Sequence, residues 1–120
     1  MERLRSQKDL RRVFGEGRRY YSPDAVLHAR ERAGGGPVAP GPRLAVVAGR
    51  RFRTAIERNR VRRTLREASR VLLREVQEPW DVVLVARRNA LSTTYKTRLC
   101  ALAQMFRNAG ILEAKADIAR

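Results

Sequence analysis

The sequence predicts a single-domain α+β protein, in which helices and a small mixed sheet pack as a sandwich. The chain has 120 residues, which is enough for one compact domain with a modest core. Three segments repeat apolar residues at helical spacing, and three short runs between them are apolar or alternate like strands. The expected order is helix, strand, strand, helix, strand, helix.

The first helix is expected to begin at Ser6, because Asp9 stands three residues later in a capping-box pattern. Apolar residues then recur at helical spacing, namely Leu10, Val13 and Phe14. Gly15 and Gly17 are expected to end this helix, since glycine is common where helices stop.

Three strands are predicted, at residues 25–30, 43–49 and 81–87. The first alternates, so that Val26, His28 and Arg30 share one face of the sheet. The third is continuously apolar in its middle, which is typical of a strand buried on both faces. Residues 31–42 are rich in glycine and proline and are expected to form a mobile loop.

The long central helix is expected to start after Thr54, with Glu57 completing another capping box. Its apolar stripe recurs at spacings of four, three, four and four, through Val61, Leu65, Ala68, Leu72 and Val76. Pro79 is expected to end the pattern.

The last helix is expected to be capped between Ser92 and Thr94 and closed by Gly110. Its apolar stripe consists of Tyr95, Leu99, Leu102 and Phe106. Residues 1–110 would then form the domain, and residues 111–120, which carry no start or stop signals, a flexible C-terminal tail.

The composition favours a nucleic-acid partner. The formal net charge is +15, and 24 of the 27 basic residues are arginine. Such a charge opposes a compact state unless a polyanion neutralises it. Arginine presents a planar fork of donors that suits phosphate and also stacks on bases, although a GC-rich codon bias would explain part of the preference for arginine.

The small number of cysteines and histidines excludes several other classes of function. With one cysteine, Cys100, and one histidine, His28, the chain has neither a zinc finger, a structural disulfide nor a Cys–His nucleophilic pair of its own. The first ten residues lack the apolar region of a secretion signal, and no stretch reaches membrane-spanning length. We therefore expect a cytoplasmic protein with no membrane association, and no obligate protein partner is evident.

A basic surface is expected on the central helix. Nine arginines lie between Arg50 and Arg70, against only Glu57 and Glu67. Successive residues of a helix are about 100° apart, so several arginines are expected on one side of the helix, next to its apolar face, where they form an arginine stripe. The arginine stripe consists of Asn59, Arg62, Arg63, Arg66 and Arg70. Arg50, Arg51 and Arg53 precede the helix, whose N-terminal end also favours phosphate.

Neither a solvated helix face nor a membrane-binding face accounts for the stripe as well as a nucleic-acid partner does. A merely solvated face usually mixes charges of both signs, whereas only Glu67 interrupts the basic residues from Arg58 to Arg70. A membrane-binding face would need exposed aromatic or leucine residues, which the stripe lacks.

Four segments, in order, resemble the bacterial ribonuclease P protein family. The segment from Arg58 to Ala68, RNRVRRTLREA, resembles the family's Arg-Asn-Arg signature. Residues 44–51 (LAVVAGRR) resemble its apolar strand ending in a basic pair, and residues 8–17 (KDLRRVFGEG) its first helix. Residues 81–87 (DVVLVAR) resemble the strand that follows the signature helix. The resemblance extends from residue 6 to about residue 109.

This resemblance implies an α-β-β-β-α-β-α sandwich with a small mixed sheet and a left-handed βαβ crossover through the signature helix, an exception to the usual hand. It also implies a holoenzyme that removes the 5′ leader from precursor tRNA. The catalytic RNA subunit would carry the active site and use Mg²⁺, held mainly by RNA, to activate water. The protein would bind ribonuclease P RNA and precursor tRNA, assist metal binding, and be inactive alone.

Carried over residue by residue, the family's RNA-binding helix corresponds to Arg58, Asn59, Arg60, Arg62, Arg63 and Arg66, preceded by Arg50 and Arg51. The cleft for the single-stranded leader, between the first helix and the sheet, would include Leu10, Phe14 and His28. The family often has Phe in place of Leu10 and Tyr in place of His28. Leucine cannot stack on a base, and Leu10 and Phe14 are also compatible with ordinary core packing. No catalytic residue is assigned to the chain, and no metal ligand is identified.

Two rival functions differ in class. A ribosomal or RNA-chaperone protein would explain the charge and fold equally well, and only the ordered resemblance disfavours it. A protein-only nuclease would need clustered carboxylates to hold metal ions. The 12 acidic residues are instead scattered through the chain.

Overall fold

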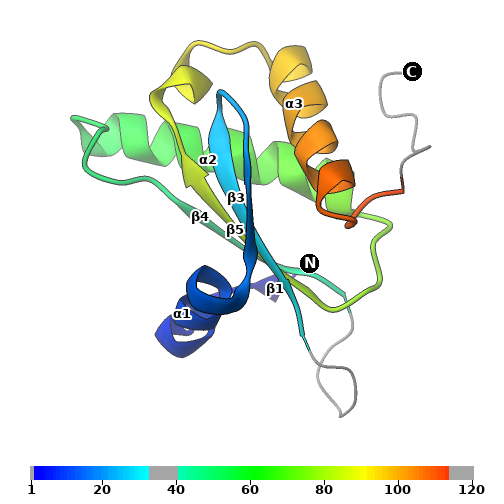
Figure 1. The fold of residues 1–120 in the computed structure, drawn as a ribbon. Coiled ribbons are helices and arrows are strands. Elements are labelled where there is room, and N and C mark those ends of the chain that lie inside the picture. Colours follow the sequence, from blue (N-terminus) through cyan, green and yellow to red (C-terminus); the bar gives the residue numbers. More distant parts are fainter. Residues whose placement is uncertain (1, 33–40, 114–120) are drawn as a thin grey trace.

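The computed structural model describes residues 2–32 and 41–113, and it confirms the mixed α+β architecture (Figure 1). Its α-helices are α1 (Gln7–Glu16), α2 (Ala55–Leu73) and α3 (Tyr95–Asn108), with a short 3₁₀ helix, η1 (Arg88–Leu91). Its strands are β1 (Glu2–Arg3), β2 (Arg18–Tyr21), β3 (Ala25–Glu31), β4 (Arg43–Val47) and β5 (Trp80–Ala86). Strand β2 is the additional strand that the family resemblance implied, whereas β1 and η1 were not expected.

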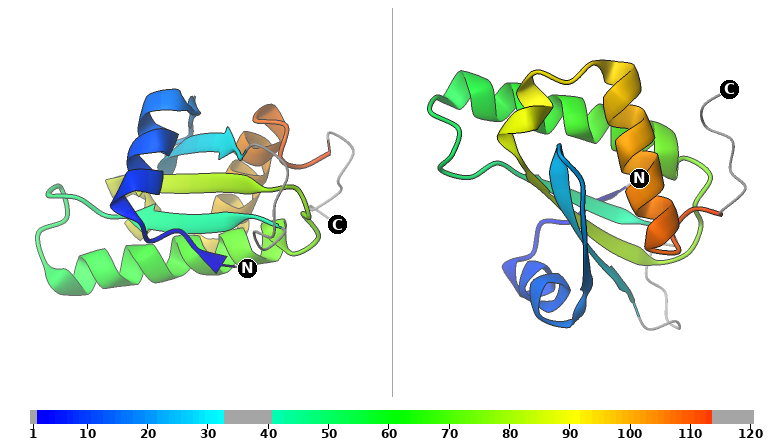
Figure 2. Two further views of the ribbon diagram at one scale, coloured as in Figure 1. Left: turned by 90° about the horizontal axis from the view of Figure 1, so that it is seen from below. Right: turned by 45° about the horizontal axis from the view of Figure 1, so that its top comes forward.

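The five strands form one mixed sheet in the order β1-β4-β5-β3-β2. Strands β4 and β5 are parallel neighbours joined through α2, and this is the unit for which the resemblance implies a left-handed crossover. Strand β3 runs antiparallel to β5 on one side and to β2 on the other. The short β1 pairs in parallel with β4, so β1 forms one edge of the sheet, beside α2 (Figure 2).

Helices cover the two faces of the sheet unequally. The main core lies between the sheet and the helices α2 and α3, and Leu27, Leu84 and Phe106 are fully buried in it. On the opposite face, α1 covers a smaller cluster around Val13 and Val83 (Figure 1). The alternation of β3 therefore places Val26, His28 and Arg30 on the α1 face, as the sequence predicted. Part of that face is left without a helix over it.

Side-chain caps start all three α-helices at the expected residues. Ser6, Thr54 and Thr94 each accept a hydrogen bond from the backbone N–H three residues later. The helix and strand ends are less well predicted. Gly15 lies inside α1, and only Gly17 caps it. Helix α2 ends at Leu73 rather than near Pro79, and β4 ends at Val47 rather than Gly49, because packing and pairing, not apolar pattern alone, set these ends.

Much of the expected loop and tail, residues 33–40 and 114–120, lies outside the described residues. Glu31 belongs to β3. After Gly110, where φ is +81°, Ile111 is buried and Leu112 packs against the main core. Tyr95, expected on the apolar face of the last helix, is 51% exposed. In the described part of the chain, no helix is long and apolar enough to span a membrane.

Candidate nucleic-acid interface

The arginine stripe of α2 lies next to the N-terminal strand. Glu2 and Arg3 of β1, Leu44 of β4, and Arg66 and Arg70 of α2 surround one shallow depression. The pKa of Arg66 is lowered by burial and by the nearby charges of Arg3, Arg70 and Arg62. The guanidinium remains protonated at neutral pH, but the shift shows that like charges are crowded here.

Acidic side chains of the described residues do not neutralise these arginine charges. Among residues 2–32 and 41–113, no arginine of the stripe forms an ion pair, and neither does Arg3. The Arg62 guanidinium donates instead to the Asn59 side-chain oxygen at 2.6 Å. Asn59 and Arg63 are exposed, and Arg62 and Arg66 are half-buried. The stripe is therefore a patch of positive charge whose mutual repulsion the acidic side chains of the described residues leave uncompensated.

Hydrogen bonds from two arginine side chains hold the turn before α2, which carries Arg50 and Arg51. Arg58 donates to the carbonyl of Phe52 at 2.9 Å, and Arg88 donates to the carbonyl of Arg51 at 2.8 Å. The Arg88 guanidinium also lies 6.0 Å from the centre of the Phe52 ring, which is buried. Arg58 thus braces the turn, while Arg50 and Arg51 are exposed. Arg60 is exposed on a different side of α2 from the stripe.

A groove of about 550 Å³ crosses the part of the α1 face that no helix covers. This sheet groove is lined by Tyr21 and Val26, by the turn at 49–52, and by Val85, Ala86 and Arg87. Val26 and Val85 are opposite each other in the ladder between β3 and β5 and form its apolar floor. Tyr21 is 61% exposed, and three arginines, Arg50, Arg51 and Arg87, stand at the rim.

The three residues expected in a leader cleft lie beside the sheet groove rather than in it. Leu10 packs on the smaller core. Phe14 is 45% exposed, and its ring meets the His28 ring edge-to-face with centroids 4.7 Å apart. His28 and Val26 are two residues apart on the same face of β3, so the Phe14–His28 pair adjoins the groove floor. Burial, and then the charge of Arg19, lower the pKa of His28, which favours its neutral imidazole.

Several residues of the candidate interface have no signal in the sequence pattern. Arg3 belongs to a two-residue strand without any apolar pattern. Tyr21, Val26 and Val85 come together only because β2, β3 and β5 are neighbours in the sheet. The one available signal was Arg87, a basic residue that directly follows the buried strand β5.

Three aspartates of the described residues are hydrogen-bonded to side chains of the chain itself. Buried Asp81 accepts hydrogen bonds from Arg43 and Arg32, and Arg43 also bonds Asp9. These partners, with Asp81 first, raise the pKa of Arg43. Asp24 accepts from Asn89 and Thr93. In the part of the chain that the structure describes, no group of three His, Cys, Asp or Glu residues could hold a metal ion.

Comparisons with known proteins point to one family. The family model described as Ribonuclease P matches residues 1–110. The ribonuclease P protein component of Symbiobacterium thermophilum is 32% identical over 111 residues, covering 92% of this chain and 93% of the relative. That of Roseiflexus sp. is 34% identical over 116 residues, covering 93% and 88%.

Solved structures share the fold. The ribonuclease P protein of Staphylococcus aureus superposes with a TM-score of 0.76 at 19% identity, covering 92% of this chain and 97% of that one. The protein from Thermotoga maritima gives 0.73 at 24% identity, covering 90% and 97%. These structures support the fold, and the family assignment rests on the sequence relatives and the family model. This chain belongs to the ribonuclease P protein family, which implies a part in tRNA 5′ processing within a holoenzyme that contains an RNA subunit.

Proposed function

We propose that this chain binds the RNA subunit of ribonuclease P through the arginine stripe and the 5′ leader of precursor tRNA through the sheet groove. In doing so it assists the Mg²⁺-dependent endonucleolytic removal of the leader. The observation that carries the proposal is the charge crowding around Arg66, which no acidic side chain of the described residues relieves.

The stripe suits a structured RNA. Its arginines project from one side of a helix of 19 residues, so their spacing is fixed by the backbone. Phosphates along a folded RNA strand are likewise held at fixed spacing, and Arg binds them through two parallel hydrogen bonds. Rigid donors facing rigid acceptors lose little conformational entropy on binding. Arg60, on another side of α2, would contact a second RNA segment or none.

The sheet groove suits a single strand. Unpaired nucleotides need surfaces on which bases stack, with positive charges beside them for the backbone. Tyr21, Phe14 and His28 supply rings on the α1 face, and Arg50, Arg51 and Arg87 supply charge at the rim. Arg50 and Arg51 also precede the helix that carries the stripe, so a leader in the groove would lie close to the bound RNA subunit.

In this division of labour the RNA subunit holds the catalytic Mg²⁺ and carries out the hydrolysis, and the protein alone is inactive. The chain's own contribution is to bind and orient the leader. The resemblance to the family supports this assignment. The carboxylates Asp81, Asp9 and Asp24 are bound to side chains of the chain itself, which agrees with metal ligands coming from RNA.

The test compares precursor and mature tRNA. In a holoenzyme reconstituted with ribonuclease P RNA, Tyr21→Ala and Phe14→Ala should each weaken binding of precursor tRNA. Loss of one stacking ring is worth about 1–3 kcal/mol, or about fivefold to 150-fold in affinity. Binding of mature tRNA, which lacks the leader, should be nearly unchanged.

Tyr95→Ala is the matched control, because Tyr95 is another exposed tyrosine, on α3 and away from the groove. Melting temperatures of all three variants establish that they are folded. Equal losses for precursor and mature tRNA in folded variants would show that the groove does not bind the leader. Leader removal by the protein without RNA subunit would refute the division of labour.

A further inference from the structure

The sheet has a second hollow, on the other face and at the other end of β3 from the sheet groove. It exists because the two neighbours of β3 differ in length. Strand β5 pairs with β3 as far as Glu31, opposite Trp80, whereas β2 begins two residues short, with Arg18 opposite Ala29. The result is an edge notch of about 300 Å³, lined mainly by Arg18, Tyr20, Glu31, Trp80 and Ala109.

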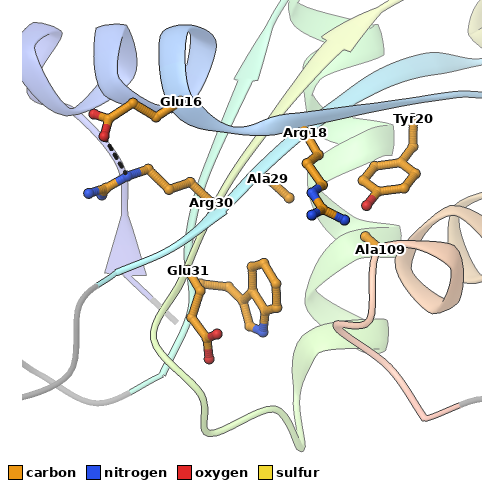
Figure 3. Close-up of a pocket in the computed structure, with 8 residues that line it drawn as sticks. Glu16, Arg18, Tyr20, Ala29, Arg30, Glu31 and Ala109 are labelled. Carbon is orange, nitrogen blue, oxygen red and sulfur yellow. Dashed lines mark ion pairs between the residues drawn. The ribbon is translucent and has the colours of Figure 1, made fainter.

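Backbone geometry holds the notch open. Before Arg18 the chain turns sharply into α1, and Gly17 passes so close to β3 that a Cβ there would lie 2.7 Å from the Ala29 carbonyl oxygen. Across the notch stands Ala109, the residue that caps α3. In Figure 3, Arg18 and Tyr20 extend from β2 toward Ala109, while Arg30 points the other way, toward Glu16.

The side chains of the notch form a recognisable combination. Trp80 and Tyr20 are half-buried rings that pack on the main core with their inner parts. Arg30 lies 4.0 Å from Glu16, so these two charges offset each other. Arg18 is exposed and forms no ion pair among the described residues. What remains is an aromatic wall, one guanidinium with free donors, and the carboxylate of Glu31, which only accepts hydrogen bonds.

We propose that the edge notch binds one unpaired nucleotide of an RNA. The base stacks against Trp80 and Tyr20, Arg18 binds the adjoining phosphate, and Glu31 accepts a hydrogen bond from an amino group of the base. Aromatic side chains with a neighbouring cation are the usual surface for single-stranded nucleic acid. A net charge of +15 favours an anionic ligand over a neutral or cationic one.

Glu31 gives the notch a preference. Cytosine and adenine carry an exocyclic amino group that donates to a carboxylate, whereas uracil offers carbonyl oxygens there, which would face Glu31 unfavourably. The notch should therefore favour cytosine or adenine over uracil. The edge notch is separate from the sheet groove, and the inference does not rest on the proposed function.

The chain contains a single tryptophan, so its emission reports on the notch alone. Short labelled oligo(C) and oligo(U) ribonucleotides are titrated into the full chain, with tryptophan-selective excitation. Label anisotropy follows all binding, and quenching of Trp80 follows stacking in the notch. Oligo(C) should quench Trp80 at lower concentration than oligo(U). The same titration with ribonuclease P RNA and with precursor tRNA shows which of them supplies the nucleotide.

Arg18→Ala should raise the oligo(C) concentration at half-quenching about tenfold, the loss of one charged hydrogen bond. Lys96→Ala removes the same charge from the first turn of α3, at the far end of that helix from Ala109, and should leave the titration nearly unchanged. Glu31→Gln should narrow the difference between oligo(C) and oligo(U), because an amide both donates and accepts.

Two results would overturn the proposal. One is unchanged Trp80 emission at RNA concentrations that saturate the anisotropy, which would place all binding elsewhere. The other is an equal shift for Arg18→Ala and Lys96→Ala, which would reduce the effect to net charge. Tyr21→Ala, in the sheet groove, should leave quenching of Trp80 intact, so failure of the groove and failure of the notch are distinguishable.

Discussion

Two glycines close together in the chain have opposite structural roles. A Cβ at Gly17 would lie 2.5 Å from the Val13 carbonyl oxygen and 2.7 Å from that of Ala29, and both are backbone atoms that cannot move aside. A Cβ at Gly15, inside α1, would meet nothing within 4 Å. Gly17 is needed for the close approach of α1 to β3, whereas Gly15 only adds flexibility to the unfolded chain.

We therefore expect opposite changes in stability from the same substitution. Gly17→Ala should lower the free energy of unfolding by about 1–3 kcal/mol, the usual cost of overpacking. Gly15→Ala should raise it by about 0.5–1 kcal/mol, because alanine favours the helix. Urea denaturation of both variants measures the difference. Equal effects would mean that α1 shifts on the sheet to make room for the methyl group.

His28 should make the stability of the domain depend on pH. Its pKa is lowered in the folded protein, first by burial and then by Arg19, from an ordinary value of 6.5. Below about pH 6.5 the unfolded chain takes up a proton that the folded protein resists, so stability is complete above that pH and is lost as the pH falls through it. His28→Phe keeps a ring against Phe14 and removes the titration.

The measurement is the melting temperature at about pH 7.5 and about pH 5.5, a range that spans the ordinary histidine pKa. The fall on acidification should be smaller in His28→Phe than in the unaltered protein, since all other titrating groups are shared. If both proteins lose the same number of degrees, the folded environment of His28 does not resist its protonation.

At the scale of elements, α2 should bind RNA mainly through phosphates. Each phosphate contact that is lost flattens the log–log dependence of affinity on salt by about 0.7–0.9 units. Arg62→Ala with Arg66→Ala should therefore reduce the slope for ribonuclease P RNA by about 1.4–1.8 units if each residue makes one contact. Neither side chain belongs to the apolar core, and removing Arg66 relieves repulsion, so the double variant should remain folded.

The control changes the same charge in a different place. Lys8→Ala with Lys96→Ala removes two exposed cations from α1 and α3, outside the stripe. Its salt slope should stay close to that of the unaltered protein. A slope that flattens equally in both double variants would indicate diffuse attraction by net charge, without specific contacts on α2.

Some helices and strands were predictable from the sequence pattern and others were not. Helix α2 and strand β5 were predictable because their apolar patterns are long, and Thr54 caps the helix as expected. Strand β1 was not, since two charged residues become a strand only by pairing with β4. The pattern alone also missed β2, whose sequence RRYY lacks alternation, and only the family resemblance implied it.

One part of the candidate site was likewise predictable from the sequence, and the other part was not. The arginine stripe follows from helical spacing, which is local, and was predicted residue by residue. The sheet groove is assembled from three separate segments, around Tyr21, at 49–52 and at 85–87. No local pattern indicates that these segments meet, because strand order brings them together. The resemblance placed Phe14 and His28 on opposite sides of a cleft, whereas their rings are in contact and the open space lies beside them.

At the scale of the whole molecule, the charge of +15 should make the free protein more stable as salt is added. The radius of gyration is 13.7 Å. Raising the ionic strength from about 0.01 M to about 0.1 M shortens the screening length from about 30 Å to about 10 Å, so repulsion stops extending across the whole molecule. Ion pairs would be weakened too, but Asp81 and its arginine partners are largely buried and therefore less screened.

We expect the melting temperature of the free chain to rise with NaCl over this range, while its affinity for RNA falls, because the same charges repel one another and attract phosphate. Thermal unfolding of the protein alone, beside RNA-binding titrations in the same buffers, measures both trends. A neutral solute at equal osmolality controls for general solvent effects. A melting temperature that falls with NaCl would mean that attractive ion pairs outweigh self-repulsion. Relief of self-repulsion would then no longer be the main physical reason for the chain to bind RNA.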